Sequence, residues 1–521
     1  MIRARILTST SSCYFRSVSI RQLSVKTMSS TISLKNSSLL QTQALINGEF
    51  VNGSVAAGET TFEVQNPATN EHLISITNTN NKDFQTAINA ASAAFTGFRK
   101  TTARARSNLL YNLYELVLEN KEDLAKIITL ENGKSYTDSL GEVAYAASFL
   151  QWFAEEAPRV NGDIIPSVNP ANRVLTIKQP LGVCGVLTPW NFPAAMITRK
   201  LGALLAAGNT AVIKPAAETP LTALAIGKLV IDAGFPKGVV NIVPTSHKNT
   251  PAAGEFICEH PVVKKVSFTG STAVGKLLAR QSASTMKKLS FELGGNAPFI
   301  VFDDADLKKA IPGVIASKFR QSGQTCVCAN RIFVHEAIYD EFAAKLVEEV
   351  SKFKLGHGLV EGVTHGPLIH ERSLNKINSL VHDAKSKDAK VLIGGSPATS
   401  LGPFFYHPTV LGDVTPKMDI FNEEIFGPVA SLVKFKTDEE VIALANDTSV
   451  GLAGYFYSED ISRIFNVAES LEVGMVGANT GAISEASVPF GGIKESGLGR
   501  EGSMYGIHDW LNIKTIVIGN I

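Results

Sequence analysis

The amino-acid sequence predicts an α/β fold in which two parallel sheets follow one another along the chain. Three observations support this prediction. The 521 residues are too many for one compact core. Short apolar or β-branched runs at 183–187, 210–214, 239–243 and 265–268 alternate with segments long enough for helices. A second alternating series extends from 297 to about 478, and such alternation is typical of parallel sheets with right-handed crossovers.

Local patterns define the elements around these runs. Residues 42–75 combine short strand-like runs with Asn-Gly and Asn-Pro turns, and residues 82–157 repeat Ala and Leu at helical spacing. One helix after the second run is well defined: Thr219 is expected to cap it, Pro220 fits its first turn, and Gly234 ends it. The first half of the chain is therefore predicted to be a doubly wound domain of the type that binds nucleotides.

Composition excludes several classes of protein. The 49 basic and 48 acidic residues leave a formal charge of only +1, without the basic stripe of a nucleic-acid-binding protein or the polybasic patch of a membrane-binding one. No run of about eighteen apolar residues is present, so we expect a soluble protein without a membrane span. Five cysteines are too few for a disulfide framework in so long a chain, which favours reduced thiols inside a cell.

The N-terminus differs from the rest of the chain. Residues 1–40 contain six basic residues, many serines and no acid, and the first acid is Glu49. This composition is typical of a mitochondrial targeting segment. The alternative is a tail without an address. Met28 offers a second start, which would omit most of the basic segment and leave a cytoplasmic protein.

Four short motifs could carry chemistry, and each is ambiguous by itself. The sequence GQTCVC at 323–328 is either an inert cysteine pair or a catalytic thiol, and no further Cys or His is close enough for a zinc site. The sequence FELGGN at 291–296 places a carboxylate at the end of a buried strand or at a solvated turn. The segment 188–193 is either a rigid surface turn or the source of an amide hydrogen-bond donor. The segment 268–275 could begin a helix whose N–H groups face a phosphate, although it lacks the usual glycine fingerprint.

In this order, the motifs strongly resemble the aldehyde dehydrogenase superfamily. The matching strings are TPWNFP (188–193), IKPAAETP (213–220), FTGSTAVG (268–275), FELGGN (291–296), GQTCVCANR (323–331), EEIFGPV (423–429) and PFGGIKESGLGREG (489–502). The resemblance implies a Rossmann-type NAD(P)-binding domain at 41–293, a second α/β catalytic domain at 294–487, and an oligomerisation β-segment. That segment would combine an excursion at 165–179 with a return and tail at 488–521. Because 513–518 would be a bare edge strand in a monomer, a homodimer or homotetramer is expected.

The resemblance assigns catalytic roles to three residues. Cys326 is the nucleophile that adds to the aldehyde, because the aldehyde carbon must become tetrahedral before it can release a hydride. Asn191 and the backbone N–H of Cys326 hold the resulting oxyanion, and Glu292 activates the water that hydrolyses the thioester. Cys328 is either a redox switch that pairs with Cys326 or a small buried residue. No metal site is expected.

The resemblance also implies NAD or NADP as the cofactor. The residues in the segments expected to hold it are Trp190, Lys214, Ala217, Gly270, Ser271, Gly275, Glu424 and Phe426. Many NAD-preferring relatives carry Glu where this chain has Ala217, and the absence of that carboxylate removes a repulsion of the 2′-phosphate. Lys214 could then pair with the phosphate. Both cofactors fit, and Ala217 favours NADP.

The choice of aldehyde depends on two arginines. Within the superfamily the local strings are most similar to the succinate-semialdehyde dehydrogenases, in which positions matching Arg199, Arg320 and Ser484 hold the distal carboxylate of the substrate. The alternative is that both arginines are structural ion-pair residues. The resemblance predicts oxidation of succinate semialdehyde in 4-aminobutyrate degradation. Other hypotheses are a dehydrogenase for another carboxylated or aliphatic aldehyde, such as glutarate semialdehyde, and a non-catalytic structural or binding protein on the same fold, which the intact catalytic set disfavours.

Overall fold

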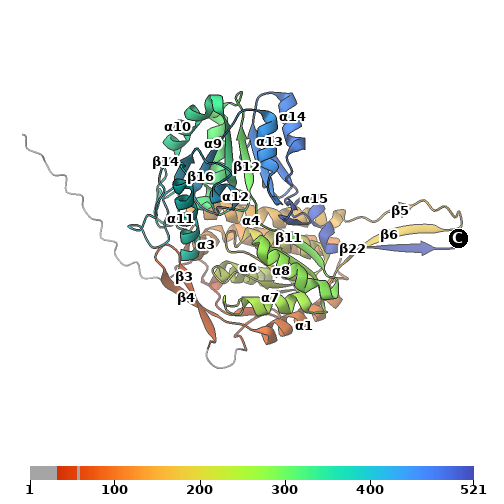
Figure 1. The fold of residues 1–521 in the computed structure, drawn as a ribbon. Coiled ribbons are helices and arrows are strands. Elements are labelled where there is room, and N and C mark those ends of the chain that lie inside the picture. Colours follow the sequence, from red (N-terminus) through yellow and green to blue (C-terminus); the bar gives the residue numbers. More distant parts are fainter. Residues whose placement is uncertain (1–31, 55–58, 521) are drawn as a thin grey trace, which may run out of the picture. The chain divides into compact units, whose positions relative to one another are not determined.

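The first sheet has eight strands in the order β2-β1-β9-β8-β7-β10-β11-β21. The computed structural model describes residues 32–54 and 59–520 (Figure 1), so most of the predicted targeting segment, with Cys13 and Met28, lies outside the described residues. The strands of this sheet are β1 Ala44–Ile46, β2 Glu49–Val51, β7 Val183–Leu187, β8 Thr210–Lys214, β9 Val240–Ile242, β10 Val263–Thr269, β11 Lys288–Glu292 and β21 Gly497–Leu498. The strands from β9 to β11 are parallel, which confirms the predicted α/β sheet.

The order of the central strands reverses between β7 and β10. From β7 the chain first adds β8 and β9 on one side, and then crosses to add β10 and β11 on the other. At such a switch point the loops that follow two neighbouring strands diverge and leave a crevice at their carboxyl ends. The loop after β7 begins at Thr188 and the loop after β10 begins at Gly270. The fold therefore directs two of the four motifs to one crevice.

Helices cover both faces of this sheet (Figure 1). They are α1 Asn81–Phe98, α2 Ala103–Glu119, α3 Lys121–Asn132, α4 Tyr136–Glu156, α5 Ala195–Ala207, α6 Pro220–Asp232, α7 Thr250–Glu259 and α8 Thr272–Ser282. On one face, α1, α7 and α8 bury apolar side chains such as Phe84, Ile257 and Leu278 against the strands. On the other face α5 and α6 contact β8 and β9, and α2, α3 and α4 pack against α5 and α6.

The second sheet has seven strands in the order β14-β15-β16-β13-β12-β18-β19. Its strands are β12 Ala297–Val301, β13 Ala329–His335, β14 Lys390–Ile393, β15 Thr409–Gly412, β16 Val429–Phe435, β18 Ala453–Tyr457 and β19 Met475–Ala478. Its helices are α9 Leu307–Lys318, α10 Tyr339–Val350, α11 Glu371–Ser386, α12 Asp419–Asn422, α13 Asp438–Asn446 and α14 Ile461–Ser470. Alternate residues of β12 enter two apolar clusters, with Phe299 on one face and Ile300 on the other. The predicted boundary at 293/294 falls between β11 and β12, where the chain passes from the first sheet to the second.

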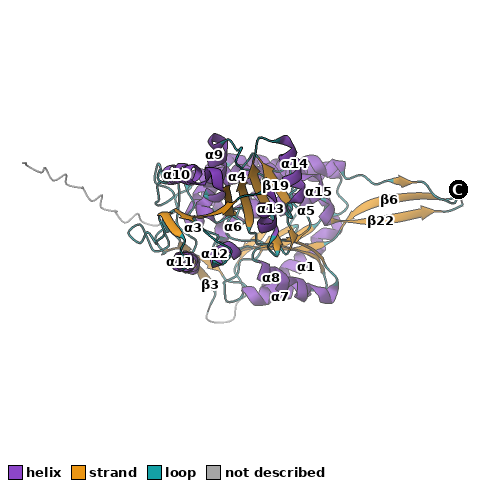
Figure 2. Ribbon diagram, turned by 45° about the horizontal axis from the view of Figure 1, so that its top comes forward, coloured by secondary structure: helices purple, strands orange, loops and turns teal. Residues whose placement is uncertain are grey.

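The third sheet is an arm formed by β5 Ile164–Ile165, β6 Arg173–Pro180 and β22 Leu511–Ile518. The predicted excursion and tail thus meet: β22 pairs with β6 along its whole length in antiparallel register. Both views show these strands extending away from the two large sheets (Figures 1 and 2). Beyond Leu511 every residue of β22 is exposed, and its outer edge pairs with no other described strand.

Smaller elements complete the described chain. The strands β3 Thr61–Asn66 and β4 Glu71–Thr77 pair with each other, β17 Val450–Gly451 pairs with β20 Ile493–Lys494, and α15 is Ser503–Gly506. Among the described residues, no helix is long and apolar enough to cross a membrane.

Residues 33–40, at the end of the predicted targeting segment, pack on the first domain. The backbone N–H groups of Lys35 and Asn36 donate to the Asp123 carboxylate on α3 at 3.0 and 2.7 Å. The side chain of Leu39 is fully buried. These residues belong to the folded domain, and the extent of a targeting segment before them stays a prediction.

The predicted cap of α6 is confirmed in its position but not in its hydrogen bond. The helix begins after Thr219 as expected, but the hydroxyl of Thr219 has no hydrogen-bond partner among the described residues. The buried carboxylate of Glu131, at the end of α3, instead accepts the backbone N–H groups of Leu221 and Thr222 at 2.8 and 2.9 Å. Free N–H groups at a helix start favour such a carboxylate, although burial raises the pKa of Glu131 to about 8. A cap supplied by a distant helix leaves no local sequence signal.

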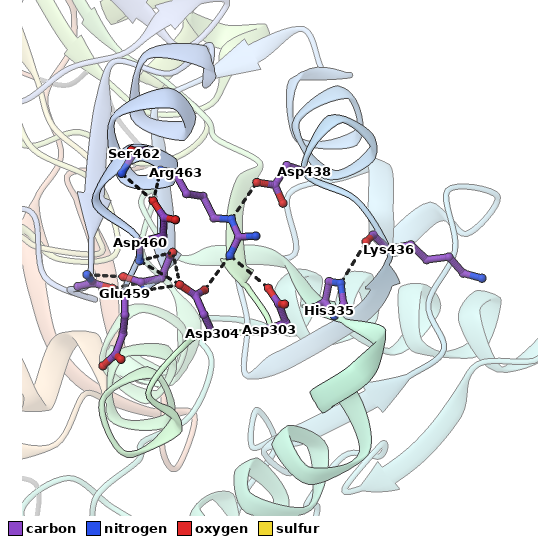
Figure 3. A network of polar contacts seen from close by, with 11 residues as sticks. Asp303, Asp304, His335, Lys436, Asp438, Glu459, Asp460, Ser462 and Arg463 are labelled. Atoms are coloured by element: carbon purple, nitrogen blue, oxygen red, sulfur yellow. Dashed lines mark hydrogen bonds and ion pairs between the residues drawn. The ribbon is translucent and has the colours of Figure 1, made fainter.

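A polar cluster joins the outer helices of the second sheet to the loop after β12 (Figure 3). Arg463 on α14 contacts Asp304 at 2.9 Å, Asp303 at 3.2 Å and Asp438 at 2.8 Å. Asp304 also accepts hydrogen bonds from the segment before α14, and Asp460 caps that helix. Each of these partly exposed pairs is weak by itself, but together they link α13 and α14 to the loop after β12.

Candidate active site

The crevice at the switch point is a cavity of about 290 Å³, lined by strand and loop residues of the first domain and by loop and helix residues of the second. Eleven predicted site residues line this cavity: Asn191, Trp190, Arg199, Gly270, Ser271, Glu292, Arg320, Cys326, Glu424, Phe426 and Ser484. Lys214, Ala217, Gly275 and Cys328 lie outside its lining. The fold therefore brings together segments that are up to almost three hundred residues apart in the chain.

The loop that carries Cys326 is held in an unusual backbone conformation. Gln321, Ser322 and Gly323 have φ angles of +50°, +53° and +74° in succession. A side chain at Gly323 would place its Cβ 2.1 Å from the carbonyl oxygen of Gly427, so only glycine fits. The side-chain amide of Gln324 accepts the backbone N–H of Ile369 at 3.0 Å and anchors the loop from the other side. This strain and anchoring present a half-buried Cys326 at the cavity wall.

The environment of Cys326 disfavours ionisation of its thiol. Burial raises the pKa of the thiol to about 12, and the positive charge of Arg199 opposes this rise only in part. A thiolate is needed for nucleophilic attack. The cavity must therefore supply a group that takes the proton.

Glu292 is the carboxylate that lies in the same cavity. It ends β11, beside Thr269 of β10, and its side chain is buried. Its Oε2 atom has no hydrogen-bond partner among the described residues. Burial, followed by the charge of Glu501, raises the pKa of Glu292 well above its ordinary value. A buried carboxylate with a free oxygen and a raised pKa is suited to act as a general base.

Asn191 faces the nucleophile loop from the loop after β7. It is buried, and its Nδ2 atom donates to the carbonyl oxygen of Gln324 at 3.1 Å. Gln324 is two residues before Cys326 in the chain. The amide donor and the thiol thus belong to contacting segments, which is the arrangement that an oxyanion site requires.

Arg199 could hold the carboxylate of the substrate or form a structural ion pair, and the structure shows features of both. It lines the cavity, but its Nε atom also donates to the buried carboxylate of Glu501 at 2.5 Å, and its guanidinium lies 4.1 Å from the ring centre of Phe490. Lys200 forms a second buried ion pair with Glu501. Arg199 is therefore a structural ion-pair residue as well as part of the cavity wall.

Arg320 has a different environment. It is exposed and has no carboxylate within ion-pair distance among the described residues. Its guanidinium lies 5.0 Å from the ring centre of Phe192. Of the two predicted arginines, Arg320 is the one whose charge is free to bind an anion.

The predicted adenosine side of the cofactor groove contains Lys214 and Ala217. Both are buried, and burial lowers the pKa of Lys214 to about 8. Within the described part of the chain, Lys214 makes no ion pair. The acid next to Ala217 is Glu218, and it lies 3.5 Å from the ring nitrogen of His247. Lys214 is thus a buried cation without a carboxylate bound to it among the described residues, and its contact with a cofactor phosphate stays a prediction.

The other residues predicted to hold the cofactor make close contacts with their neighbours. A Cβ at Gly275 would lie 2.5 Å from Leu293, so this glycine lets α8 approach β11. Ser271 caps α8, which leaves the N–H groups of that helix start near the cavity. Glu424 accepts the backbone N–H of Gly295 at 3.2 Å with one oxygen, and burial raises its pKa to about 7. Phe426 packs edge to face on Trp190 with ring centres 5.6 Å apart. These groups fit a dinucleotide cofactor.

Cys328 lies beneath the loop and does not reach the cavity. It is buried, and its sulfur lies 3.6 Å from the carbonyl oxygen of Lys318. The four described cysteines, at 184, 258, 326 and 328, are all free thiols. The redox switch stays a prediction.

Sequence reasoning did not assign several other cavity residues. They are Tyr145, Phe192, Met196, His370 and Phe490, among others. Phe192 and Phe490 fall inside quoted motifs and could have been found there. Tyr145 on α4 and His370 at the start of α11 belong to no motif, so only the tertiary fold reveals them.

Comparison with known proteins identifies the family. Residues 54–516 match the aldehyde dehydrogenase family. The chain belongs to this family. It is 55% identical to succinate-semialdehyde dehydrogenase [NADP(+)] 1 of Schizosaccharomyces pombe, over 92% of this chain and 95% of that protein. It is 50% identical to a glutarate-semialdehyde dehydrogenase of Pseudomonas aeruginosa, over 94% of this chain and all of that one. A crystal structure of an NADP-dependent enzyme of E. coli has a TM-score of 0.91 and 51% identity, and covers 94% of this aldehyde dehydrogenase and all of the E. coli chain.

Proposed function

We propose that this protein oxidises succinate semialdehyde to succinate and reduces NADP or NAD. The observation that carries the choice of substrate is Arg320, an exposed cation on the wall of the cavity, close in sequence to Cys326. Ser484 lines the same cavity and adds a hydroxyl. A guanidinium and a hydroxyl bind a carboxylate well and would direct the far aldehyde carbon toward the thiol. The name of the S. pombe relative supports this substrate.

Three residues carry the proposed reaction. Cys326 loses its proton and its sulfur adds to the aldehyde carbon, which gives a tetrahedral thiohemiacetal. The Asn191 amide and the Cys326 backbone N–H stabilise its negative oxygen. When bound, the nicotinamide cofactor supplies the hydride acceptor. Glu292 then takes a proton from water, the water oxygen adds to the Cys326 thioester, and the acid is released with return of the thiol.

The proposed cofactor contacts favour NADP. Lys214 would pair with the 2′-phosphate, and Ala217 leaves no carboxylate to repel it. Glu424 would accept the hydroxyl groups of the nicotinamide ribose. Replacing Ala217 with Glu is expected to shift kcat/KM from NADP toward NAD, and this ratio measures the assignment.

The second candidate is glutarate semialdehyde, which carries one more methylene between its carboxylate and its aldehyde. The P. aeruginosa relative bears that name, and a single methylene gives only modest discrimination. The test compares kcat/KM for succinate semialdehyde, glutarate semialdehyde and butanal with both cofactors. We expect succinate semialdehyde to be best and butanal to be worst. A preference for butanal would refute carboxylate recognition, and no activity with either cofactor would favour the non-catalytic binding protein.

We further propose assembly and location. The exposed edge of β22 favours a homodimer or homotetramer formed through the arm. The acid-free basic composition before Glu49 favours import into the mitochondrial matrix, with a cytoplasmic form if translation starts at Met28. Mass measurement in solution and microscopy of fusions that begin at Met1 or Met28 test the two proposals. A monomeric mass, or identical distributions of the two fusions, would contradict them.

A further inference from the structure

A polar cluster is buried behind the cavity, and the proposed chemistry gives it no role. It consists of Asn132 and Lys134 at the turn between α3 and α4, Glu142 on α4, and Gln321 in the nucleophile loop; we call it the Lys134 cluster. All four side chains are at most 3% exposed. None of them lines the cavity, so substrate does not touch them.

Two members of the cluster hold the main chain of the oxyanion donor. The carbonyl oxygen of Asn191 accepts hydrogen bonds from Lys134 Nζ at 2.8 Å and from Gln321 Nε2 at 2.6 Å. The same ammonium also donates to Gln321 Oε1 at 3.1 Å. Because Gln321 belongs to the loop that carries Cys326, this carbonyl links the oxyanion donor directly to the nucleophile loop.

The other two members hold the residues on either side. Asn132 donates to the carbonyl oxygen of Trp190 at 2.9 Å. Glu142 forms a buried ion pair with Lys134, and its other oxygen accepts the backbone N–H groups of Ala194 and Ala195 at 2.8 and 3.3 Å. The backbone from 190 to 195 is therefore fixed at four of its six residues by a single connected network.

Stability alone does not account for this arrangement. A buried ion pair is often no more stabilising than apolar groups of the same volume. Gln321 also holds a left-handed backbone conformation, with φ +50°, which is unfavourable for a residue other than glycine. Gln321 is one of two non-glycine residues of this loop with a positive φ, and its amide is the one that reaches Asn191. Costs of this kind are typical of functional sites, where they fix geometry.

We propose that Lys134 and Gln321 are positioning residues that set the distance and angle between the Asn191 amide and Cys326. Hydrogen bonds to the Asn191 carbonyl hold the backbone of Asn191 and therefore the position of its Cβ atom. The side-chain amide is then already in place when the oxyanion forms on the Cys326 adduct. A preorganised donor needs no rearrangement during the reaction, and this is the source of its catalytic effect. The inference rests on the proposed roles of Asn191 and Cys326 and deepens them.

A double-mutant cycle tests the proposal. Gln321→Leu removes the amide at similar volume, and Asn191→Ala removes the donor itself. We expect Gln321→Leu to lower kcat by about 10- to 100-fold when Asn191 is present. This loss is smaller than the about 100- to 1000-fold loss expected when one oxyanion donor is removed altogether. The KM for NADP should change by less than about 2-fold. In the Asn191→Ala background the same substitution should change kcat by less than about 2-fold.

Lys134→Met gives a second cycle if Gln321→Leu does not fold, and Lys134→Arg should recover part of the lost kcat because it restores a donor. The matched control is Arg106→Met. Arg106 is a partly buried cation whose Nε and Nη1 atoms donate to the main-chain carbonyl oxygens of Ala206 and Thr101 at 2.8 and 2.5 Å, outside the cavity. It should lower the melting temperature and leave kcat unchanged.

Two results would overturn the proposal. One is a Gln321→Leu loss that multiplies with that of Asn191→Ala, since the residues would then act independently. The other is a loss of kcat for Arg106→Met as large as that for Lys134→Met, since any loss of stability would then suffice. The cycle uses whichever aldehyde the wild type oxidises fastest, so a wrong assignment of succinate semialdehyde does not affect it.

Discussion

Replacing Arg320 and Arg199 by Met should have opposite consequences, although both arginines line one cavity. Arg320 is exposed and has no acidic partner among the described residues. Its removal therefore leaves no buried charge behind. Arg199 is paired with Glu501 in the interior, so its removal strands part of a buried carboxylate. We expect Arg320→Met to be a folded enzyme with altered specificity, and Arg199→Met to be unstable.

The magnitudes follow from these environments. Hydrogen bonds to charged groups contribute about 1.5–3 kcal/mol, and solvent screening at the exposed Arg320 places its effect at the lower end, about 1.5–2 kcal/mol for a carboxylated substrate. That corresponds to a loss of about 10- to 30-fold in kcat/KM for succinate semialdehyde. Butanal, which has no carboxylate, should lose less than about 3-fold. Breaking a buried ion pair costs about 3–5 kcal/mol, and Lys200, which remains paired with Glu501, should keep the cost of Arg199→Met near the lower value.

Initial rates of NADPH formation with the two aldehydes give the specificity ratio, and urea unfolding gives the stability. Arg320→Lys is the matched variant: it keeps the charge but loses the planar pair of donors, so it should show an intermediate ratio. The reasoning is refuted if Arg320→Met lowers kcat/KM equally for both aldehydes. It is also refuted if Arg199→Met keeps wild-type stability.

Four further predictions concern single positions. Lys214→Met should raise the KM for NADP and leave the KM for NAD unchanged. Because burial lowers the pKa of Lys214 to about 8, the wild-type KM for NADP should rise between about pH 7 and pH 9, as the ammonium loses its proton. A flat profile would contradict the phosphate contact. Glu292→Gln should abolish turnover, and it should raise Tm at pH 8 but not at pH 4. The folded protein disfavours the ionised carboxyl group, so Glu292 lowers the stability of the wild type at pH values above the ordinary pKa of 4.5, and Gln does not. An equal Tm difference at both pH values would show that burial of the charge is not the cause. Cys328→Ala should remove the fraction of peroxide inactivation that dithiothreitol reverses, and an unchanged fraction would dispose of the switch. Val517→Asp on the exposed β22 should reduce the mass in solution to that of a monomer, and an unchanged mass would place the interface elsewhere.

The sequence was informative wherever local chemistry decides structure. Short apolar runs such as 183–187, which alternate with segments long enough for helices, indicate buried strands, and β7 has those same bounds. It was misleading where a distant group supplies the contact. Thr219 has the residue type of a cap, but Glu131 takes that role from another helix. Composition also gave no sign of where the fold begins, because a basic, serine-rich stretch continues through Lys35, whose backbone already contacts Asp123.

The two reactive groups show why spacing alone could not define the site. Glu292 ends a strand of the first sheet, where sheet proteins bind their ligands. Cys326 precedes β13 of the second sheet, at the amino end of a parallel strand, a position that carries no such expectation. The cavity forms where segments that precede strands of the second sheet lie beside segments that follow strands of the first sheet. Apolar periodicity within either half of the chain does not predict how the two halves pack, so only the resemblance to a family predicted that Cys326 and Glu292 share one site.

The buried charges around Cys326 and Glu292 explain how both residues can work in one cavity. Arg199 and Lys200 are two cations, and Glu501 between them is one anion, so this triad leaves one positive charge beside the reactive pair. Burial raises the pKa values of both Cys326 and Glu292, so the interior disfavours a negative charge on either group, and the positive charge of Arg199 opposes this rise at both. Two negative charges on the pair would cost more than one, because like charges repel. If Glu292 holds the one charge first, transfer of the Cys326 proton to Glu292 creates the thiolate without changing the charge of the cavity. The base that later activates water is then also the group that prepares the nucleophile, and Glu292→Gln should slow alkylation of Cys326 as well as hydrolysis of the thioester.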